Sequence, residues 1–323
     1  MSNKQITLDH AVATQVQTGL ITDNEGFFFQ RELEYIKAQS FEVQYADLPA
    51  RNLFPVTNEA GDGIETITYR VYDQVGMAQV INGYAKDLPR ADASGQEVTI
   101  PVRSLGISYG YSLDEIRAAQ RVNRPLDQRR ANAGVRATEE KINDVAFYGD
   151  ADSGLPGFLS NPNIPVGNVV NGGGGNSEWN TKTPDEILFD VNDLFADIFE
   201  STKMKERGNT LLLPPSQWSL IMSTPRATGV DTTIAQFLAM NSPYLNSLED
   251  IIPVNELVGA GVGGVDRMVA YDLSPDKLQL EIPVELEWLP VQVQGLEFTV
   301  PGRSRLGGIN YYFPLSAAFA DGI

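Results

Sequence analysis

Two stretches of the sequence decide the fold: IETITYRVY at residues 64–72 and QEVTIPVRSLGISYGY at residues 96–111. Apolar and polar residues alternate in both, which is the period-two pattern of half-buried β-strands. At about 3.3 Å per residue, each stretch could extend for roughly 30 Å or more. An isolated two-stranded hairpin is only marginally stable in water, so we expect this arm to lie on the protein's own body or on another copy. The pattern therefore favours assembly over catalysis.

A helix start follows directly on the second stretch. Ser112 and Glu115 have the spacing of a capping box, in which each side chain accepts the backbone N–H of the other residue. The helical pattern covers residues 113–148. It is interrupted at Pro125, because the residue before a proline avoids helical angles. Gly149 is a C-terminal stop signal. For the second helical segment we predict a stripe of mostly small residues, made of Ala133, Ala137, Ile142, Val145 and Ala146.

The middle of the chain has the pattern of an α/β layer. Thr183 and Glu186 form a second capping box, with Pro184 at the first helical position. Apolar residues then recur at helical spacing over residues 187–198, and TLLL at 210–213 is predicted to be a buried strand. Alternation of apolar and polar residues predicts a β-rich tail after this layer.

The overall composition excludes several classes of protein. The net charge is −18, which disfavours DNA recognition as a primary function; we interpret it as a means of solubility and of control over self-association. The sequence contains no run of about 18 apolar residues, so neither a membrane span nor a membrane partner is expected. The N-terminus lacks an apolar signal core, which predicts production and assembly in the cytoplasm.

Groups that could perform catalysis are scarce. His10 is the one histidine and there is no cysteine, which argues against a Ser-His-Asp triad, a thiolate nucleophile and a zinc site. The glycine run at 172–175 lacks the Lys-Ser or Lys-Thr of a phosphate loop. Asp150 and Asp152 lie close in sequence, so a carboxylate-dependent hydrolase is kept as a distant alternative. We therefore expect no catalytic residue, no cofactor and no metal.

Basic residues concentrate in the helical region after the hairpin. Between residues 113 and 138 there are six arginines against three acids. This excess predicts either a solvated face with ion pairs to neighbouring subunits or a surface that faces nucleic acid loosely. The candidate inner-face or inter-subunit residues are Arg117, Arg121, Arg124, Arg129, Arg130 and Arg136. The candidate contacts of the hairpin arm are Lys86, Asp87 and Arg90.

The order of these parts resembles the major capsid proteins of tailed bacteriophages, which share the Hong Kong 97-type shell fold with encapsulins. GLPGFLSNP at 154–162 resembles the turn that leaves the spine helix, and residues 280–323 are similar to the C-termini of one such capsid family. The resemblance implies an α+β fold with a long β-hairpin arm, a spine helix, a peripheral β-sheet domain and an α/β axial domain. It assigns 1–40 to an N-terminal arm, 41–63, 112–165 and 268–323 to the peripheral domain with the spine helix, 64–111 to the hairpin arm, and 166–267 to the axial domain.

The resemblance also implies a function. It predicts a non-enzymatic major capsid protein that assembles with itself, as pentamers and hexamers, into an icosahedral virus head around double-stranded DNA. Contact with the packaged DNA would be weak and non-specific, and scaffold, portal and decoration proteins are the implied further partners. Because the chain begins almost at the arm, scaffolding is expected to be a separate protein or absent. Some members of the family join a hairpin lysine to an asparagine, but for Lys86 a solubilising role is favoured. The alternative is an encapsulin-type compartment that encloses a cargo protein.

Overall fold

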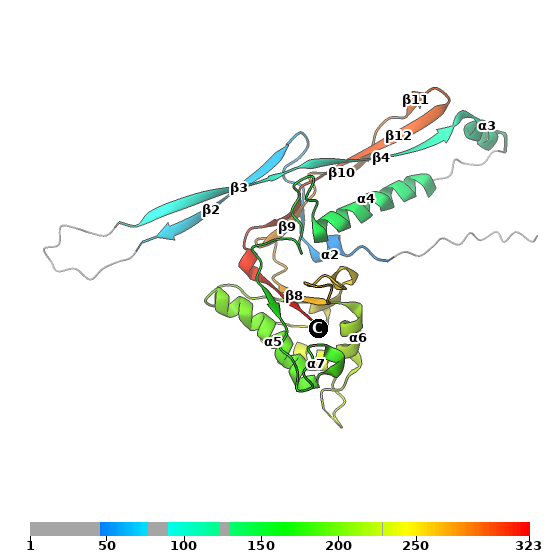
Figure 1. Cartoon of the computed structure of the whole chain (residues 1–323). Helices are drawn as coiled ribbons and strands as arrows, with labels where there is room; N and C mark the ends of the chain where they lie inside the picture. The colour runs from blue at the N-terminus through cyan, green and yellow to red at the C-terminus, as the bar shows by residue number, and fades with distance from the viewer. Residues whose placement is uncertain (1–45, 77–89, 123–128, 228) are drawn as a thin grey trace, which may run out of the picture. The chain divides into compact units, whose positions relative to one another are not determined.

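The computed structural model describes residues 46–76, 90–122, 129–227 and 229–323, and residues 48–323 form one compact unit (Figure 1). Its helices are α2 (Ala50–Leu53), α3 (Leu113–Val122), α4 (Arg129–Tyr148), α5 (Pro184–Ser201), α6 (Pro215–Ser223) and α7 (Ile234–Asn241), with 3₁₀ turns at Trp179–Thr181, Leu248–Asp250, Asn255–Leu257 and Pro314–Ser316. Its strands are β1 (Val56–Thr57), β2 (Thr66–Val75), β3 (Asp92–Pro101), β4 (Arg103–Ser112), β5 (Val166–Asn168), β6 (Thr210–Leu213), β7 (Ile251–Pro253), β8 (Arg267–Tyr271), β9 (Leu278–Glu281), β10 (Val284–Trp288), β11 (Gln292–Gln294), β12 (Glu297–Leu306), β13 (Gly308–Tyr311) and β14 (Ala317–Asp321).

The predicted two-stranded arm is present as β2 and β3. The two strands pair antiparallel, with Thr66 opposite Pro101 at one end and Val75 opposite Asp92 at the other. The paired part is shorter than the 64–111 stretch that the sequence predicted. Val102 separates β3 from β4, and β4 joins a different sheet. Alternation alone did not show this change of partner, because the period-two pattern continues through Pro101.

The second sheet joins β4 to the C-terminal part of the chain. Strand β12 pairs antiparallel with β4 along ten residues, from Arg103 opposite Leu306 to Ser112 opposite Glu297. Strands β10 and β11 also pair antiparallel with β12. The predicted β-rich tail is therefore confirmed, and its longest strand is held by a segment almost two hundred residues earlier.

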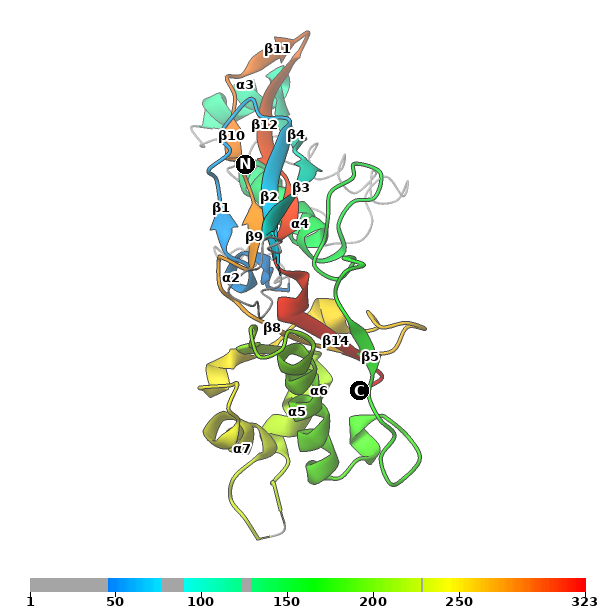
Figure 2. The same cartoon turned by 90° about the vertical axis from the view of Figure 1, so that its left-hand side faces the viewer.

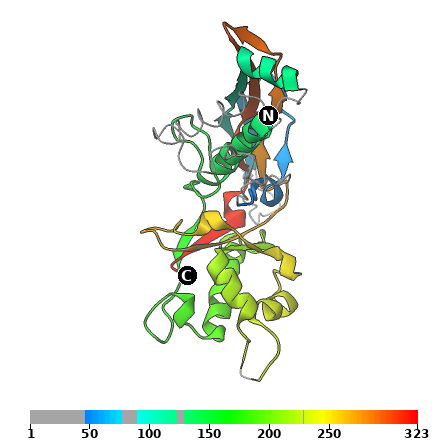
Figure 3. The ribbon, with the colours of Figure 1, turned by 90° about the vertical axis from the view of Figure 1, so that its right-hand side faces the viewer.

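A five-stranded sheet, in the order β5-β14-β8-β6-β7, is buried on both faces. Leu211, Met268 and Ala270 belong to the core that contains the apolar faces of α5, α6 and α7. Their neighbours Leu212 and Val269 belong to the core that contains α2 and α4. Successive residues of a strand face opposite sides of a sheet, so β6, β8 and β14 contribute to both cores. Figures 2 and 3 show α5, α6 and α7 on one side of β8 and β14 and α2 and α4 on the other.

The first of these cores is rich in aromatic rings. Phe158 lies at its centre, within 4.8 Å of the ring of Phe54 and 5.4 Å of Tyr271, measured between ring centroids. A small sheet, in the order β1-β9-β13, also packs against this core, to which β9 and β13 contribute buried side chains. The predicted strand TLLL coincides with β6 and is buried at all four residues.

The spine helix consists of α3 and α4, and the predicted interruption at Pro125 lies outside the described residues. Helix α4 ends at Tyr148, and Gly149 follows with φ 75°, which confirms the predicted glycine stop. The predicted stripe was wrong in its first half, because Ala133 and Ala137 are exposed. The buried residues of α4 are Gly134, Thr138, Ile142, Asn143, Val145, Ala146 and Phe147.

Candidate assembly surfaces

The outer half of the hairpin is exposed on both faces. All residues from 90 to 97 are exposed, and on the opposite strand Val71 and Tyr72 are 39% and 66% exposed. Cross-strand pairs hold the ribbon together, namely Arg70 with Glu97 at 2.7 Å and the hydroxyls of Thr68 and Thr99 at 2.8 Å. Pairs of this kind add only about 0.2–1 kcal/mol each, so the ribbon has little stability of its own.

The root of the hairpin, in contrast, is fixed to the folded unit. The Tyr69 hydroxyl donates a hydrogen bond to the carbonyl oxygen of Tyr311 at 3.1 Å, and its ring packs edge-on against Tyr312 with centroids 5.0 Å apart. Ile100 and Val102 are buried on the other strand. The hairpin is thus anchored at one end and exposed along the rest of its length.

A cluster of charges holds the loop that leads into the hairpin. Asp62, in the loop before β2, bonds the guanidinium of Arg303 on β12. Arg305, two residues further along the same strand, donates to the carbonyl oxygen of Ile64. Arg303 lowers the pKa of Asp62, after the larger effect of the Gly63 backbone N–H. Sequence reasoning missed this cluster, because its members lie about 240 residues apart.

A second exposed surface lies at the β10–β12 end of the four-stranded sheet. Within eight residues, Leu289, Val291, Val293 and Leu296 are 38%, 57%, 63% and 72% exposed. Strand β11 contributes Val293 and pairs only with β12 among the described strands. Clustered exposed apolar residues mark interaction surfaces more often than scattered ones do.

The predicted basic residues divide into distinct settings. Arg130, on α4, forms a forked ion pair with Glu115 on α3 (2.8 and 3.0 Å). The Arg130 guanidinium also lies over the Tyr111 ring, with its central carbon 4.8 Å from the ring centroid. Arg136 pairs with Glu140 one turn away at 2.8 Å. Arg117, Arg121 and Arg129 are exposed, as is the hairpin residue Arg90, whereas Arg124, Lys86 and Asp87 lie outside the described residues.

The Arg130 ion pair also completes the capping box at the start of α3. The Ser112 N–H donates to the Glu115 carboxylate at 3.1 Å, and the Glu115 N–H donates to the Ser112 hydroxyl at 3.2 Å, which confirms the predicted motif. Arg130 and then the Ser112 N–H hold the pKa of Glu115 at about 2, against an ordinary value of 4.5. Glu115 is thus charged at any pH near neutral, and Arg130 joins the two halves of the spine helix.

One arginine ties three elements together beside the spine helix. Arg51, on α2, donates to the Glu139 carboxylate on α4 at 2.7 and 2.9 Å. It also donates to Glu285 on β10 at 2.8 and 2.7 Å. A guanidinium can bind two carboxylates in this way because its donors form a planar fork. Nothing local in the sequence marks Arg51 for this role.

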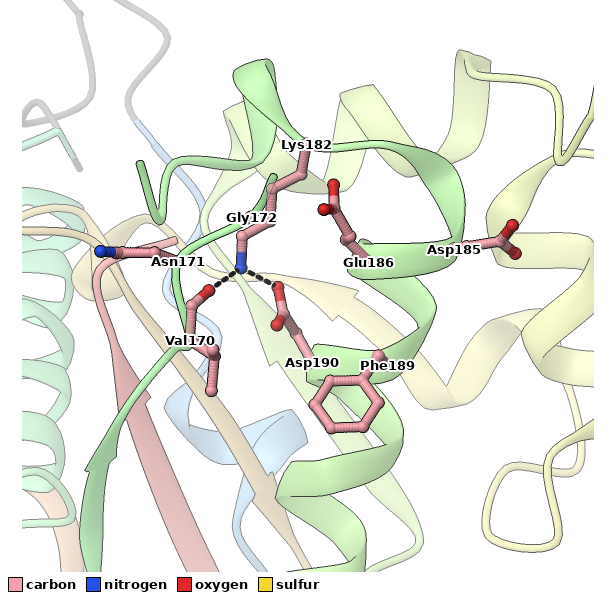
Figure 4. A pocket seen from close by; sticks show the side chains of 8 residues that line it. All are labelled: Val170, Asn171, Gly172, Lys182, Asp185, Glu186, Phe189 and Asp190. Atoms are coloured by element: carbon pink, nitrogen blue, oxygen red, sulfur yellow. Dashed lines mark hydrogen bonds and ion pairs between the residues drawn. The ribbon is translucent and has the colours of Figure 1, made fainter. Parts of the chain in front are cut away.

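A small hollow of about 210 Å³ lies beside the N-terminal end of α5 (Figure 4). Lys182 and Asp190 form a buried ion pair at its wall, with Nζ and Oδ2 2.6 Å apart, and Lys182 also donates to the carbonyl oxygen of Val170. Phe189 is 59% exposed beside them. The glycine run at 172–175 is held here because the Gly173 N–H donates to Glu186 at 2.7 Å.

The residues that the sequence analysis weighed for catalysis can now be placed. The Asp150 carboxylate accepts hydrogen bonds from Ser153, which is the role of a turn residue. Within the described ranges, no group of three or more His, Cys, Asp or Glu residues is placed to hold a metal ion. Nor is any helix there both long and apolar enough to cross a membrane. His10 lies outside these ranges.

Comparison with solved structures defines the class of protein. The chain is similar to the capsid protein of Myoviridae phage XM1, with a TM-score of 0.78 and 18% identity over 93% of this chain and 100% of that one. It is also similar to a chain from Mycobacterium phage Bobi, with a TM-score of 0.57 and 15% identity over 95% and 97% of the two chains. The fold is therefore that of phage shell proteins, the Hong Kong 97 type, as predicted.

The sequence itself places the chain in a family. The model of the major capsid protein family matches residues 76–323, and the chain belongs to that family. It is a capsid shell protein, whose place is the virion shell. The chain is also 24% identical over 257 residues to the type 1 encapsulin shell protein EncA of Myxococcus xanthus, covering 75% of this chain and 81% of EncA.

Proposed function

We propose that copies of this chain form pentamers and hexamers and close an icosahedral virus head around double-stranded DNA. One observation carries the proposal beyond family membership: the outer half of the hairpin is exposed on both faces while its root is buried. A two-stranded ribbon in this condition gains stability only when another surface covers it. A neighbouring subunit is the surface that a shell provides.

The proposed contact with DNA is weak for each subunit and repeated over many copies. A chain with a net charge of −18 can neutralise few phosphates, and each contact adds about 0.9 to the salt dependence of binding. Arg117 and Arg121 on α3 are exposed and are the described arginines that suit such contact. Arg130 and Arg136 are engaged with Glu115 and Glu140, which favours a structural role for them. We propose no catalytic activity, and assembly in the host cytoplasm.

The predicted domain division belongs to this proposal as well. The hairpin arm would reach a neighbour, and the α5–α7 layer would form the axial part of each ring. The layer is continuous with the rest of the unit, because β8 and β14 from the closing stretch lie in its sheet. Arg90 of the hairpin, together with Lys86 and Asp87 outside the described residues, remains a proposed contact with the neighbouring subunit. Scaffold, portal and decoration proteins remain the proposed further partners.

A charge placed on the exposed hairpin tests the proposal. Val71→Glu should leave the fold intact but prevent most of the protein from assembling, because a carboxylate buried without a partner costs about 2 kcal/mol or more at each contact. Light scattering and negative-stain microscopy measure assembly, and circular dichroism measures folding. The matched control is Val71→Gln, which has nearly the same shape as the Glu variant and occupies the same exposed position without a charge, and burying a neutral amide costs less than burying a charge.

The two variants must differ for the proposal to stand. We expect the control to assemble at least several times more efficiently than Val71→Glu, with the same melting temperature for both. Equal and full assembly of both variants would show that this part of the hairpin remains uncovered in the shell. Unfolding of Val71→Glu would contradict the exposure described above.

The similarity to EncA favours one alternative, a compartment that encloses protein. The contents of purified particles separate the two functions. DNA that survives nuclease treatment supports the virus head. A defined protein inside particles without DNA supports the compartment, and would leave the shell fold and the hairpin contact unaffected.

A further inference from the structure

One carboxyl group is buried at the root of the hairpin and forms no ion pair with the other described residues. Glu281 is 4% exposed and ends β9, opposite Thr57 of β1 on one side and Gly308 of β13 on the other. Its backbone accepts the Gly307 N–H at 2.9 Å. A Cβ built on Gly307 would lie 2.9 Å from the Cβ of Glu281 and 3.6 Å from Cδ1 of Ile67 on β2. Glu281 therefore lies next to the first hairpin strand.

The groups around Glu281 are neutral or negative. Glu59 disfavours the ionised form of Glu281, whereas the side chains of Asn310 and Tyr312 favour it; the Tyr312 hydroxyl also donates to Gln279 at 2.9 Å. Tyr69 of the hairpin packs edge-on against the Tyr312 ring. The basic residues just before β9 and on β12 have carboxylate partners of their own: Lys277 pairs with Glu206 at 2.6 Å, and Arg303 and Arg305 pair with Asp62.

Burial without a cation favours the protonated form of a carboxyl group. Desolvation is the largest effect and raises the pKa of Glu281 above its ordinary 4.5. The Asn310 side chain and the Tyr312 hydroxyl lower this pKa, the negative charge of Glu59 raises it, and the net direction is upward. The pKa of Tyr312 is raised to about 12, by burial first and then by Glu281. When Glu281 ionises, its charge lies beside Tyr312, whose ring packs against Tyr69 of β2.

We propose that Glu281 is a proton-operated switch that sets how firmly the hairpin is held to the folded unit. With the carboxyl protonated, Tyr69, Tyr312 and Ile67 pack over it and the root is closed. With the carboxyl ionised, water must reach Glu281, and the packing of Tyr69 on Tyr312 loosens. The hairpin then turns more freely about its root. This inference rests on the fold alone and holds whether the particle encloses DNA or protein.

The direction of the pH effect follows from the chemistry. A carboxyl group that binds its proton more tightly in the folded state contributes stability below its ordinary pKa, and that contribution is lost as the pH rises through the folded-state value. The root is therefore firmest at or below about pH 4.5 and loosens as the pH rises above it.

Amide hydrogen exchange of the protein, kept in one assembly state throughout, tests the switch. The exchange rate of peptides covering residues 64–70 and 308–313 is divided by that of the buried α5 peptide 187–198, which corrects for the intrinsic pH dependence of exchange. Between pH 4.5 and pH 8 we expect this ratio to rise at least threefold in the wild type. Glu281→Gln should remove the rise, and Glu59→Gln, which changes an exposed neighbour, should keep most of it.

The outcomes separate clearly. A ratio that stays flat in the wild type would overturn the proposal, whether or not the Glu281→Gln variant folds. A rise that persists unchanged in a folded Glu281→Gln variant would assign the titration to another group and would also overturn it. A rise that is lost only in Glu281→Gln supports the switch.

Discussion

At the scale of single residues, one tightly constrained contact lies between the spine helix and the β4–β12 sheet. The ring of Trp288 is held between two glycines: a Cβ on Gly134 would lie 2.7 Å from it, and a Cβ on Gly302 would lie 2.6 Å from it. The ring of Tyr109 meets Trp288 edge-on, with centroids 4.9 Å apart. Helix α4 can approach the sheet this closely because Gly134 carries no side chain.

We expect Gly134→Ala to destabilise the fold by about 1 kcal/mol. Alanine gains about 1 kcal/mol in helix propensity, but overpacking against a ring costs about 1–3 kcal/mol. Denaturant unfolding measures the difference. The matched control is Gly106→Ala on β4, where a Cβ meets nothing within 4 Å. Combining Gly134→Ala with Trp288→Phe should give less than the sum of the two losses, and an additive result or a stabilised Gly134→Ala would show that the contact is not tight.

At the scale of elements, α5 shows how a helix is fixed at its start. The predicted capping box is confirmed, with the Thr183 hydroxyl and the Glu186 carboxylate each accepting the other's backbone N–H. Lys182, just before the cap, joins Val170 after β5 to Asp190 on the second turn of α5. The Trp179 indole N–H donates to the same Asp190 oxygen at 2.9 Å. The helix, the glycine loop and the sheet edge are thus held at one point.

Removal of one partner of this buried pair should be costly. The side chains of Lys182 and Asp190 are 1% and 3% exposed, so Lys182→Met leaves a carboxylate without its cation. We expect a loss of about 3–5 kcal/mol in unfolding free energy. The double variant Lys182→Met with Asp190→Leu should recover most of this loss, because two apolar groups replace both charges. Equal losses in the single and double variants would mean that the cost comes from packing and not from charge.

Local signals predicted these elements, and non-local contacts account for what was missed. The two capping boxes, the Gly149 stop and the strand TLLL all depend on a few neighbouring residues. The exchange of partners at Val102 depends instead on β12, almost two hundred residues away. The buried face of α4 includes Gly134, not Ala133, because Trp288 of a distant strand decides which residue must be small. Arg51 was missed for the same reason, since its carboxylate partners lie 88 and 234 residues away.

At the scale of the whole molecule, one sheet connects two cores, and two surfaces remain exposed. Strands β6, β8 and β14 of the five-stranded sheet give alternate residues to the α5–α7 core and to the α2–α4 core. The hairpin and the β10–β12 end carry exposed apolar residues with no covering segment among those described. Order of parts in the sequence was enough to predict the shell fold. The sequence was not enough to predict the root of the hairpin, which depends on Asp62, Tyr69 and Glu281.

The central claim is that this chain builds a closed shell through contacts between copies, with the hairpin covered by a neighbour. Electron cryomicroscopy of the purified, assembled protein tests it most directly. We predict closed particles with icosahedral symmetry in which Val71 and Tyr72 of one subunit are buried against the next, across an interface well above the roughly 1,000 Å² of a specific contact. Protein that remains monomeric across salt, pH and crowding conditions, or a shell in which the hairpin touches no neighbour, would contradict the account.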